Sequence, residues 1–562
     1  MVLQQHAPEL RSQPPDGPDT LPATEPPQPI RHMGKIVGSG MALMIIATVA
    51  NKAMTMLAQW VLGAKLSPED FAVFAYATAI AGFTMVCREA GVRELLVQRG
   101  EKEYENLAGT GFWLALAWNL LVSAIMAAIA LPVSRLLRQP LLAPMLWVIA
   151  AALPIGTIGG ILQTSMRLHL RFRDFAVNNL TSSFARQGSM IAMALGGMGA
   201  MSQAWPVLVG TIAEAGGAFL RSRDALWRRP MEVRRWPGLL RQSKWLMFAS
   251  VANFAVDWGP FLLMAGITAL SHAQSGILLR LAKAFALTDK EAGFFYFAFM
   301  ITAQVGVLLS FNLSLVLTPA LARLNDEPER LASGVLRSLR TLMLAGSIGS
   351  LGLACVIEPL QALLWPGPHG DPHGKWFPAV GSVIILGAFF PWRITFGVSS
   401  SMLQAQGRFR LYALLTAIEG GGLTLFTILG AWTSPTATSM SWWAGGWLLV
   451  SRLVLTIWVM RSIRVPVWDV LMSTFPAWLA ALAATATALA CVHFIPYKQL
   501  IGSTHPRVYN AVSVLVAGTT CALVFTLICR TMLKSHLVEV LSVSPARLRP
   551  IAARLLLLPE PP

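Results

Sequence analysis

The sequence predicts an all-α, polytopic membrane protein of about fourteen transmembrane helices, arranged as two pseudo-repeated six-helix lobes around a central cavity plus two extra helices. Three observations lead to this fold class. The chain of 562 residues is 55% hydrophobic but only 13% charged, whereas soluble proteins carry about 25% charged residues. Its apolar residues are gathered into runs of roughly 20 or more, the length that crosses about 30 Å of hydrocarbon. Finally, two stretches of the first half recur in the second half.

The apolar runs are separated by short polar loops, which place the spans along the chain. The predicted spans are residues 37–63, 70–92, 108–133, 141–166, 175–198, 203–221, 244–268, 292–319, 339–365, 377–403, 410–432, 438–460, 468–494 and 508–530.

The domain organisation follows from these spans and from composition. The N-terminal tail is rich in Pro and Gln and has no apolar run, so we expect it to be disordered. The predicted divisions are a disordered cytoplasmic tail at 1–34, an N-lobe of six helices at 35–222, a basic cytoplasmic linker at 223–242, a C-lobe of six helices at 243–465, the two extra helices at 466–532 and a second cytoplasmic tail at 533–562.

The net charge of +17 is explained by the loops and does not indicate nucleic-acid binding. Alternate loops on the side of the N-terminus hold roughly 30 Lys and Arg, and the opposite set holds roughly nine. Because basic loops stay in the cytoplasm, both termini are predicted to be cytoplasmic. The sequence has no base-stacking motif or zinc spacing, so no nucleic-acid partner is expected.

No metal site or cofactor is predicted. The five cysteines lie in or beside apolar runs, and no pair has the spacing of metal ligands. The loop that contains His369, Asp371 and His373 superficially resembles a set of ligands, but no further ligand is near it in the sequence. We interpret it as a polar turn.

The most informative pattern is an internal repeat. Residues 151–173 align without a gap with residues 388–410. The matches pair Ala151 with Ala388, Pro154 with Pro391, Gly160 with Gly397, and the triplet Arg171-Phe172-Arg173 with Arg408-Phe409-Arg410. Chance similarity between apolar helices does not readily give a shared mid-helix proline together with a terminal Arg-Phe-Arg.

A second ungapped match pairs residues 66–80 with residues 287–301. The two matches place the second predicted helix opposite the eighth and the fourth opposite the tenth. This implies two bundles in parallel orientation, an architecture that recurs in transporters with the substrate path at the interface of the repeats.

Four stretches carry a family resemblance: REAGVRELLVQRGE (88–101), RLHLRFRDFA (167–176), LTPALARLND (317–326) and LQAQGRFR (403–410). Together they resemble the Wzx-type oligosaccharide flippases of the multidrug/oligosaccharidyl-lipid/polysaccharide exporter superfamily. The resemblance covers about residues 35–465. It implies twelve core helices in two lobes around a central cavity.

The resemblance also implies a function. Members export undecaprenyl-diphosphate-linked oligosaccharide across the bacterial inner membrane by alternating access, for exopolysaccharide or O-antigen synthesis. The implied partners are the lipid-linked oligosaccharide, membrane lipids, and the polysaccharide polymerase and chain-length machinery. The sequence departs from the family at residues 273–288, whose periodicity predicts an amphipathic helix lying on the extracytoplasmic surface.

Ionisable residues inside the spans are the candidate site, because each costs about 2.5–3.5 kcal/mol at a helix centre unless it faces a cavity or a partner. The predicted substrate-binding cations are Lys52, Arg186 and Arg393. The predicted coupling or ion-pair acids are Asp257, Glu419 and Glu214. The predicted polar cavity residues are Thr48, Thr55, Gln59, Asn179 and Asn253.

Helical spacing and the repeat support these choices, although structural ion pairs remain an alternative for each. Lys52 lies on a polar stripe of the first span, and Arg186 lies on another in the fifth. Arg393 follows Pro391 and either faces the cavity or snorkels to the interface. Asp257 lies in the span that corresponds to the first one, which predicts a relationship between Lys52 and Asp257.

Two other functions compete with a flippase. A multidrug antiporter of the related extruder family would be expected to have an acid-dominated cavity. The candidate cavity residues here are three cations and three acids, which favours an anionic substrate. An enzyme of the same pathway would need a catalytic loop, but no Asp-x-Asp pair, Ser/His/Asp arrangement or glycine-rich phosphate loop occurs between the spans. We therefore expect a transporter with no catalytic residues.

Overall fold

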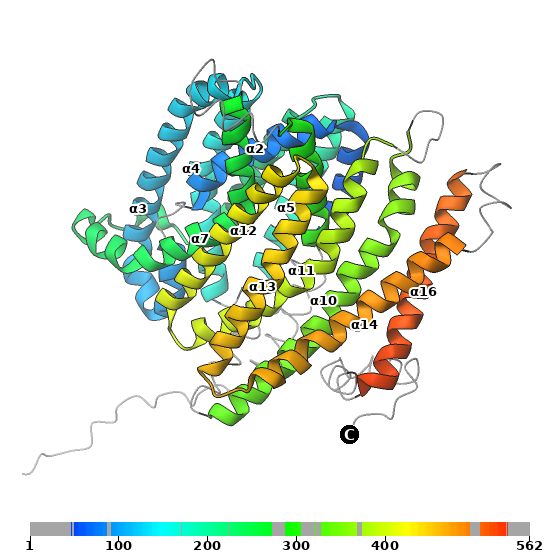
Figure 1. The fold of residues 1–562 in the computed structure, drawn as a ribbon. Helices are drawn as coiled ribbons and strands as arrows, with labels where there is room; N and C mark the ends of the chain where they lie inside the picture. The colour runs from blue at the N-terminus through cyan, green and yellow to red at the C-terminus, as the bar shows by residue number, and fades with distance from the viewer. Residues whose placement is uncertain are drawn as a thin grey trace, which may run out of the picture.

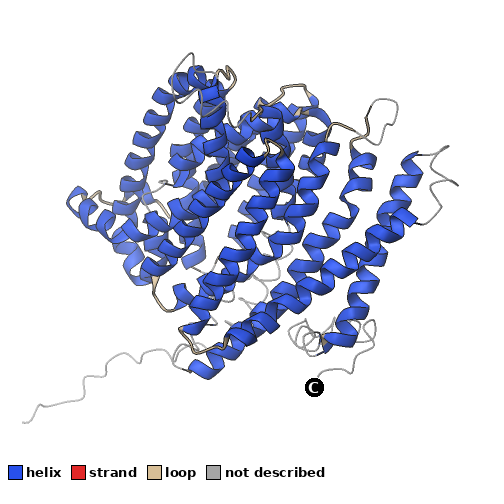
Figure 2. Ribbon diagram, viewed as in Figure 1, coloured by secondary structure: helices blue, strands red, loops and turns tan. Residues whose placement is uncertain are grey.

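The fold is seen in a computed structural model, which describes residues 50–86, 92–169, 171–222, 224–271, 287–304, 327–367, 374–494 and 506–534, with Ala47, Leu321 and Leu537. Figure 2 draws these residues as helices joined by loops, with no strand among them. Some expectations lie outside the described residues: the tail 1–34, Thr48, nearly all of 273–288, the loop with His369 and His373, and nearly all of 533–562.

Each predicted span overlaps a helix of the described chain. Two helical segments are named here by their residues, helix 50–65 and helix 289–304. The others are α2 (Pro68–Val86), α3 (Val92–Leu137), α4 (Leu142–Leu168), α5 (Phe172–Leu195), α6 (Met201–Arg221), α7 (Trp236–Ser271), α10 (Pro328–Leu364), α11 (Phe377–Ala405), α12 (Phe409–Thr433), α13 (Ala437–Arg461), α14 (Val467–Phe494) and α16 (Pro506–Met532). Among the described residues, nine of these helices are long and apolar enough to cross a membrane.

The helices pack as two groups joined along one seam. In the N-terminal group, α4 packs against α2, α3 and α6, and α5 packs against α6. In the C-terminal group, α7 packs against α12, and α11 packs against α10 and α13. These groups are called the N-lobe and the C-lobe below. At the seam between them, α7 of the C-lobe contacts α2 and α3 of the N-lobe.

The two extra helices lie outside the lobes. Figure 1 shows α14 and α16 at one edge of the molecule, beside α10, and both helices pack against α10. The packing uses small buried residues such as Ala480, Ala484 and Ala517, together with Cys355 and Cys521. Small side chains let helix backbones approach closely within a bilayer, which is how transmembrane helices associate.

The repeat found in the sequence has matching local structure. Arg171 and Arg408 precede α5 and α12 with nearly equal backbone angles, φ −81° and ψ 55° against φ −83° and ψ 51°. The amide of Arg171 donates to the Met166 carbonyl at 2.8 Å, and that of Arg408 donates to the Leu403 carbonyl at 2.9 Å. The Arg-Phe-Arg match is therefore a repeated turn between helices.

The second match also has a structural counterpart. Ser67 and Asp70 exchange hydrogen bonds between side chain and backbone at the start of α2, at 3.0 and 3.1 Å. This is the reciprocal arrangement that satisfies free amides at a helix start. At the equivalent place before helix 289–304, the Glu291 amide donates to the Thr288 hydroxyl at 3.3 Å.

Candidate functional site

The C-lobe contains a polar cavity of about 210 Å³ between α7, helix 289–304, α11, α12 and α13. Four predicted site residues line it: Asn253, Asp257, Arg393 and Glu419. The lining positions recur at intervals of three and four residues along each helix, which brings them to one face. They are Asn253, Val256 and Asp257 on α7, Arg393, Phe396, Gly397 and Ser400 on α11, and Tyr412, Thr416 and Glu419 on α12. We call this the C-lobe cavity.

Arg393 and Asp257 form an ion pair across the C-lobe cavity, from α11 to α7. The Arg393 side chain is 22% exposed and that of Asp257 is 46% exposed. The guanidinium group of Arg393 lies 5.7 and 5.8 Å from the ring centres of Phe390 and Phe299. Aromatic faces stabilise a cation in such positions. Arg393 thus faces the cavity while its guanidinium stays partly accessible.

A second ion pair, between Glu419 of α12 and Arg452 of α13, lies deeper. The two side chains are 0% and 5% exposed, and the guanidinium of Arg452 lies 4.6 Å from the Phe396 ring centre. A fully buried pair of this kind is costly to break, because removing either member leaves an uncompensated buried charge. Arg452 is absent from the residues predicted from sequence, although it meets the same criterion of an ionisable residue inside an apolar span.

Asn253 is engaged in the same wall of the cavity. Its side-chain amide donates to the Tyr412 hydroxyl at 2.8 Å and to the Ala249 carbonyl at 2.9 Å. The first bond joins α7 to α12, and Asp257 follows one turn further along α7. Both polar groups therefore project from one face of α7.

Lys52 reaches the C-lobe from the N-terminal half of the chain. Its ammonium group donates to the Gln304 side-chain oxygen at 2.8 Å, and Gln304 follows Ala303, which lines the C-lobe cavity. The predicted relationship between Lys52 and Asp257 is replaced by two separate contacts, because Asp257 binds Arg393. Lys52 instead crosses the seam to helix 289–304.

Arg186 lies at another part of the seam. Its side chain is exposed, and its charge interacts with Glu214 of α6 and with Tyr296 of helix 289–304. Its methylene groups pass over Gly210 of α6, where a Cβ atom would lie 2.8 Å from the Arg186 Cβ. Arg186 and Glu214 are thus brought together, but neither lines the C-lobe cavity.

The remaining polar candidates are more scattered. Thr55 accepts a hydrogen bond from the Gln187 side chain at 3.2 Å, which joins helix 50–65 to α5. Gln59 is half-buried on the same helix, and Asn179 is exposed on α5. The neighbouring Asn178 is the buried one, and its amide donates to the Glu214 carbonyl at 3.2 Å.

At the predicted extracytoplasmic end, the two lobes pack tightly together. The indole of Trp365 donates to the Trp60 carbonyl at 2.9 Å, and that of Trp376 donates to the Gly63 carbonyl at 2.7 Å. Trp376 is fully buried and stacks on Phe297 at 3.9 Å between ring centres. The seam is therefore closed at this end.

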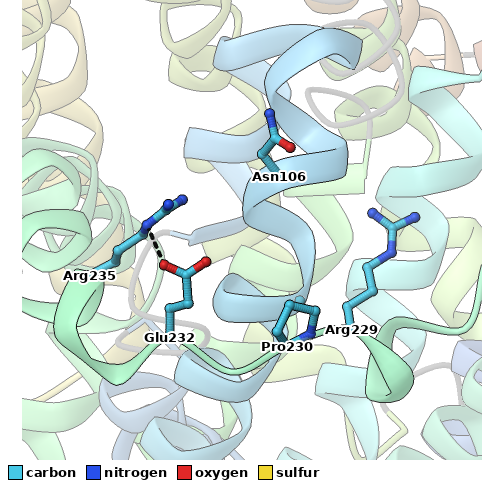
Figure 3. Close-up of a pocket in the computed structure, with 6 residues that line it drawn as sticks. Asn106, Arg229, Pro230, Glu232 and Arg235 are labelled. Carbon is cyan, nitrogen blue, oxygen red and sulfur yellow. Dashed lines mark ion pairs between the residues drawn. The ribbon is translucent and has the colours of Figure 1, made fainter.

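The linker between the lobes forms a separate pocket of about 700 Å³ against α3. In Figure 3, Asn106 on α3 lies above the linker, with the Glu232–Arg235 ion pair to one side and Arg229 to the other. Both arginines have acidic partners, since Arg229 donates to Asp224 at 2.8 Å. We call this the linker pocket.

Asp224 anchors the linker to the N-lobe. Its carboxylate accepts hydrogen bonds from the hydroxyls of Tyr104 at 2.9 Å and Ser165 at 3.0 Å. Burial raises the pKa of the Tyr104 phenol above its ordinary value, and the nearby Asp224 charge adds to the effect. Tyr104 is therefore a stable donor, and the linker is held against α3 and α4 before α7 begins at Trp236.

Comparison with known proteins identifies what shares this architecture. Residues 61–364, more than half of the chain, match the family model described as a polysaccharide biosynthesis protein, Polysacc_synt_3. No curated protein sequence matches the chain.

Solved structures with a similar fold are membrane transporters. The lipid II flippase MurJ in an inward closed conformation aligns with a TM-score of 0.63 and 11% identity, over 88% of this chain and 100% of that one. An inward-facing multidrug resistance MATE family transporter of the MOP superfamily aligns with a TM-score of 0.57 and 14% identity, over 75% and 98% of the two chains. A MOP superfamily transporter from Pyrococcus furiosus aligns with a TM-score of 0.52 and 14% identity, over 75% and 95%. These matches confirm the predicted all-helical, multi-pass fold.

Proposed function

Because the chain belongs to the polysaccharide biosynthesis protein family, we propose that it is a flippase that exports undecaprenyl-diphosphate-linked oligosaccharide repeat units across the bacterial inner membrane for exopolysaccharide or O-antigen synthesis. Family and fold are those of multi-pass transporters of the MOP superfamily. In this proposal the seam opens alternately to either side, both termini are cytoplasmic, and the polymerase and chain-length machinery receive the product. The protein itself catalyses no covalent step.

The observation that carries the proposal is the charge around the seam. Lys52 and Arg186 contribute cations from the N-lobe, and Arg393 contributes one from the C-lobe. Both acids of the C-lobe cavity, Asp257 and Glu419, are paired with arginines. The two ion pairs leave the C-lobe cavity neutral overall, and Lys52, which contacts the uncharged Gln304, adds a positive charge beside it. This excess favours an anionic cargo over the cationic drugs of a multidrug antiporter.

The chemistry of the cargo explains the need for these cations. The polyprenyl tail remains in lipid while the diphosphate and sugars cross, and an unpaired charge in hydrocarbon costs far more than a membrane protein can offset by packing. Lys52 and Arg186 would replace the lost hydration of the diphosphate, and the fork of Arg393 suits phosphate oxygens. Before the cargo binds, the ion pair with Asp257 keeps the cavity neutral. When the diphosphate arrives, Arg393 would exchange Asp257 for the phosphate oxygens.

The membrane potential can supply part of the driving force. A potential of 100 mV, negative inside, contributes about 2.3 kcal/mol for each elementary charge moved outward. For a diphosphate with about two charges the contribution is roughly 4–5 kcal/mol. Proton coupling through Asp257 would add to this but is not required.

The proposal is tested by reversing the charge of Lys52. In cells that lack the chromosomal copy, the Lys52→Glu variant is expected to lose at least about tenfold of surface polysaccharide, because a carboxylate would repel the diphosphate. Polymer is measured by immunoblot, and membrane insertion of the variant is checked in the same cells. Lys52→Arg should retain export.

A matched control is Lys534→Glu, which makes the same change at an exposed position at the end of α16. It should leave polymer output unchanged. Normal polymer output from an inserted Lys52→Glu protein would contradict the role given to Lys52.

A further inference from the structure

A pocket of about 620 Å³ lies at the predicted extracytoplasmic end of the seam, away from the C-lobe cavity. Three lysines line it: Lys65 from the N-lobe, and Lys290 and Lys375 from the C-lobe. All three side chains are exposed, and the acidic residue in the lining is Glu69. We call this the lysine pocket.

The position of these lysines is unusual for the membrane face on which they lie. Extracytoplasmic loops of membrane proteins are poor in Lys and Arg, and the sequence assigns only about nine such residues to this side. Three of them gather at one pocket. They come from three separate parts of the chain and meet at one lining.

Helix ends add to the positive potential. The pocket is lined by the first turns of α2, helix 289–304 and α11, which begin at Pro68, Asp289 and Phe377. The start of a helix carries a partial positive charge, so anions are favoured there and lysines are disfavoured. Acidic residues lie in the first turns of α2 and helix 289–304. The first turn of α11 has none, and Trp376, which precedes it, provides no side-chain cap.

The acids near the pocket other than Glu69 hydrogen-bond to donors other than the three lysines, although the charge of Asp70 also acts on Lys375. Asp70 accepts from Ser67. Asp289 accepts from Tyr76 at 3.0 Å and from Gln139 at 2.9 Å. Glu291 accepts from the amide of Ala437 at 2.7 Å.

The three lysines differ in the hydrogen bonds that they make. Lys375 donates to the carbonyls of Ala64 and Leu66 at 2.9 and 2.6 Å, which fastens the loop before α11 to the end of helix 50–65. Lys65 and Lys290 make no hydrogen bond or ion pair within the described chain. Among the described residues, no other group therefore holds their ammonium groups.

We propose that the lysine pocket binds a phosphate-bearing anion, and that its ligand is the diphosphate of the lipid-linked cargo as it leaves on the extracytoplasmic side. The identity of the cargo rests on the proposed function, whereas the anion site rests on the pocket itself. Because the lysines come from both lobes, a bound anion offsets their mutual repulsion only when the seam is closed. Anion binding therefore favours the closed seam and helps to reset the transporter after export.

The test places a reporter in the pocket of the full-length protein. Glu69→Cys is reconstituted in phosphatidylcholine vesicles and labelled from outside with a membrane-impermeant maleimide, and modification of residue 69 is measured by peptide mass spectrometry. Farnesyl diphosphate and inorganic pyrophosphate are expected to slow labelling about tenfold, as charge-assisted hydrogen bonds hold the anion over the thiol. Adding Lys65→Gln and Lys290→Gln should abolish this protection.

The matched control adds Arg135→Gln and Arg507→Gln, which remove two charges from the same predicted face outside the pocket; protection should persist. Vesicles that contain phosphatidylglycerol distinguish the source of the phosphate. Protection by diphosphates alone supports the cargo as ligand, and equal protection by phosphatidylglycerol assigns the phosphate site to bulk lipid and overturns the exit role. Unslowed labelling, or protection that survives the lysine changes, overturns the anion site. These results are independent of the Lys52 export test.

Discussion

The N-lobe and the C-lobe have the same scaffold but carry different charges at equivalent positions. In the ungapped register of the repeat, Arg393 of the C-lobe corresponds to Gly156 of the N-lobe, and Glu419 corresponds to Ser182. The C-lobe therefore has two buried or half-buried ion pairs in a place where the N-lobe has a glycine and a hydroxyl. The difference concentrates the polar cavity in the C-lobe.

The opposite difference occurs one turn further along. Arg186 of the N-lobe corresponds to Leu423 of the C-lobe, which is 1% exposed and part of the apolar core. What the repeat shares is the backbone: a proline in mid-helix, the turn at Arg-Phe-Arg, and the helix starts capped by Ser67 and Thr288. Backbone requirements have thus been kept in both lobes, while the ionisable groups are set independently in each.

The largest expected effect comes from breaking the pair that exists only in the C-lobe. Glu419→Ala leaves Arg452, 5% exposed, with an uncompensated buried charge. Loss of one partner of a buried pair costs about 3–5 kcal/mol of stability. We expect markedly earlier thermal unfolding of the purified protein in detergent.

Replacing both partners with apolar residues, Glu419→Leu with Arg452→Met, should recover much of this loss. The equivalent N-lobe change, Ser182→Ala, should cost no more than about 1 kcal/mol. If Glu419→Ala unfolds at the wild-type temperature, the buried pair does not hold α12 and α13 together.

A smaller effect on stability and export is expected from disturbing Arg186, the cation that the N-lobe has and the C-lobe lacks at the equivalent position. In Gly210→Ala, the new methyl group would lie 2.8 Å from the Arg186 Cβ, so Arg186 must move. Overpacking of this kind costs about 1–3 kcal/mol, and export of polysaccharide should fall severalfold. Gly216→Ala lies on the same helix with nothing within 4 Å of the added atom, and it should behave as wild type.

The smallest effect concerns the contact that joins the lobes at Lys375. Although Lys375 is an exposed residue, partial burial of its ammonium group against the end of helix 50–65 lowers its pKa from 10.5, so the closed seam binds its proton less tightly than an open, hydrated state does. Closed-seam stability should therefore rise with pH between the lowered pKa and 10.5, and be constant above it. The distance between spin labels across the seam measures this, and Lys375→Gln should abolish the pH dependence. A seam that loosens as pH rises through that window would contradict the sign.

Much of the fold could be predicted from the sequence, because apolar run length and the repeat depend on local chemistry. Arg171 and Arg408 show why: the same short turn ends a helix in both lobes, whatever surrounds it. The site was predicted only in part. The criterion of an ionisable residue inside an apolar span led to Arg393, Asp257 and Glu419, which do share one cavity.

The sequence could not predict which charged residues contact each other. Asp257 binds Arg393 from 136 residues away, and only the packing of α7 against α12, with α11 across the cavity, decides between Arg393 and Lys52 as its partner. Gln304 is uncharged, so the criterion of an ionisable residue does not include it. Its side-chain oxygen nevertheless accepts the hydrogen bond from Lys52. Arg452 could have been found by the criterion already in use.

The central claim is that the cations of the seam and of the C-lobe cavity carry a diphosphate, and flipping in proteoliposomes tests it most directly. Wild-type protein and Arg393→Gln would be compared with a fluorescent polyprenyl-diphosphate oligosaccharide and with the uncharged polyprenyl glycoside of the same sugar. We predict that the wild type flips the diphosphate substrate and discriminates against the uncharged one, and that Arg393→Gln loses at least about tenfold of diphosphate flipping. Equal flipping of both substrates by the wild type, or undiminished diphosphate flipping by Arg393→Gln, would contradict the account.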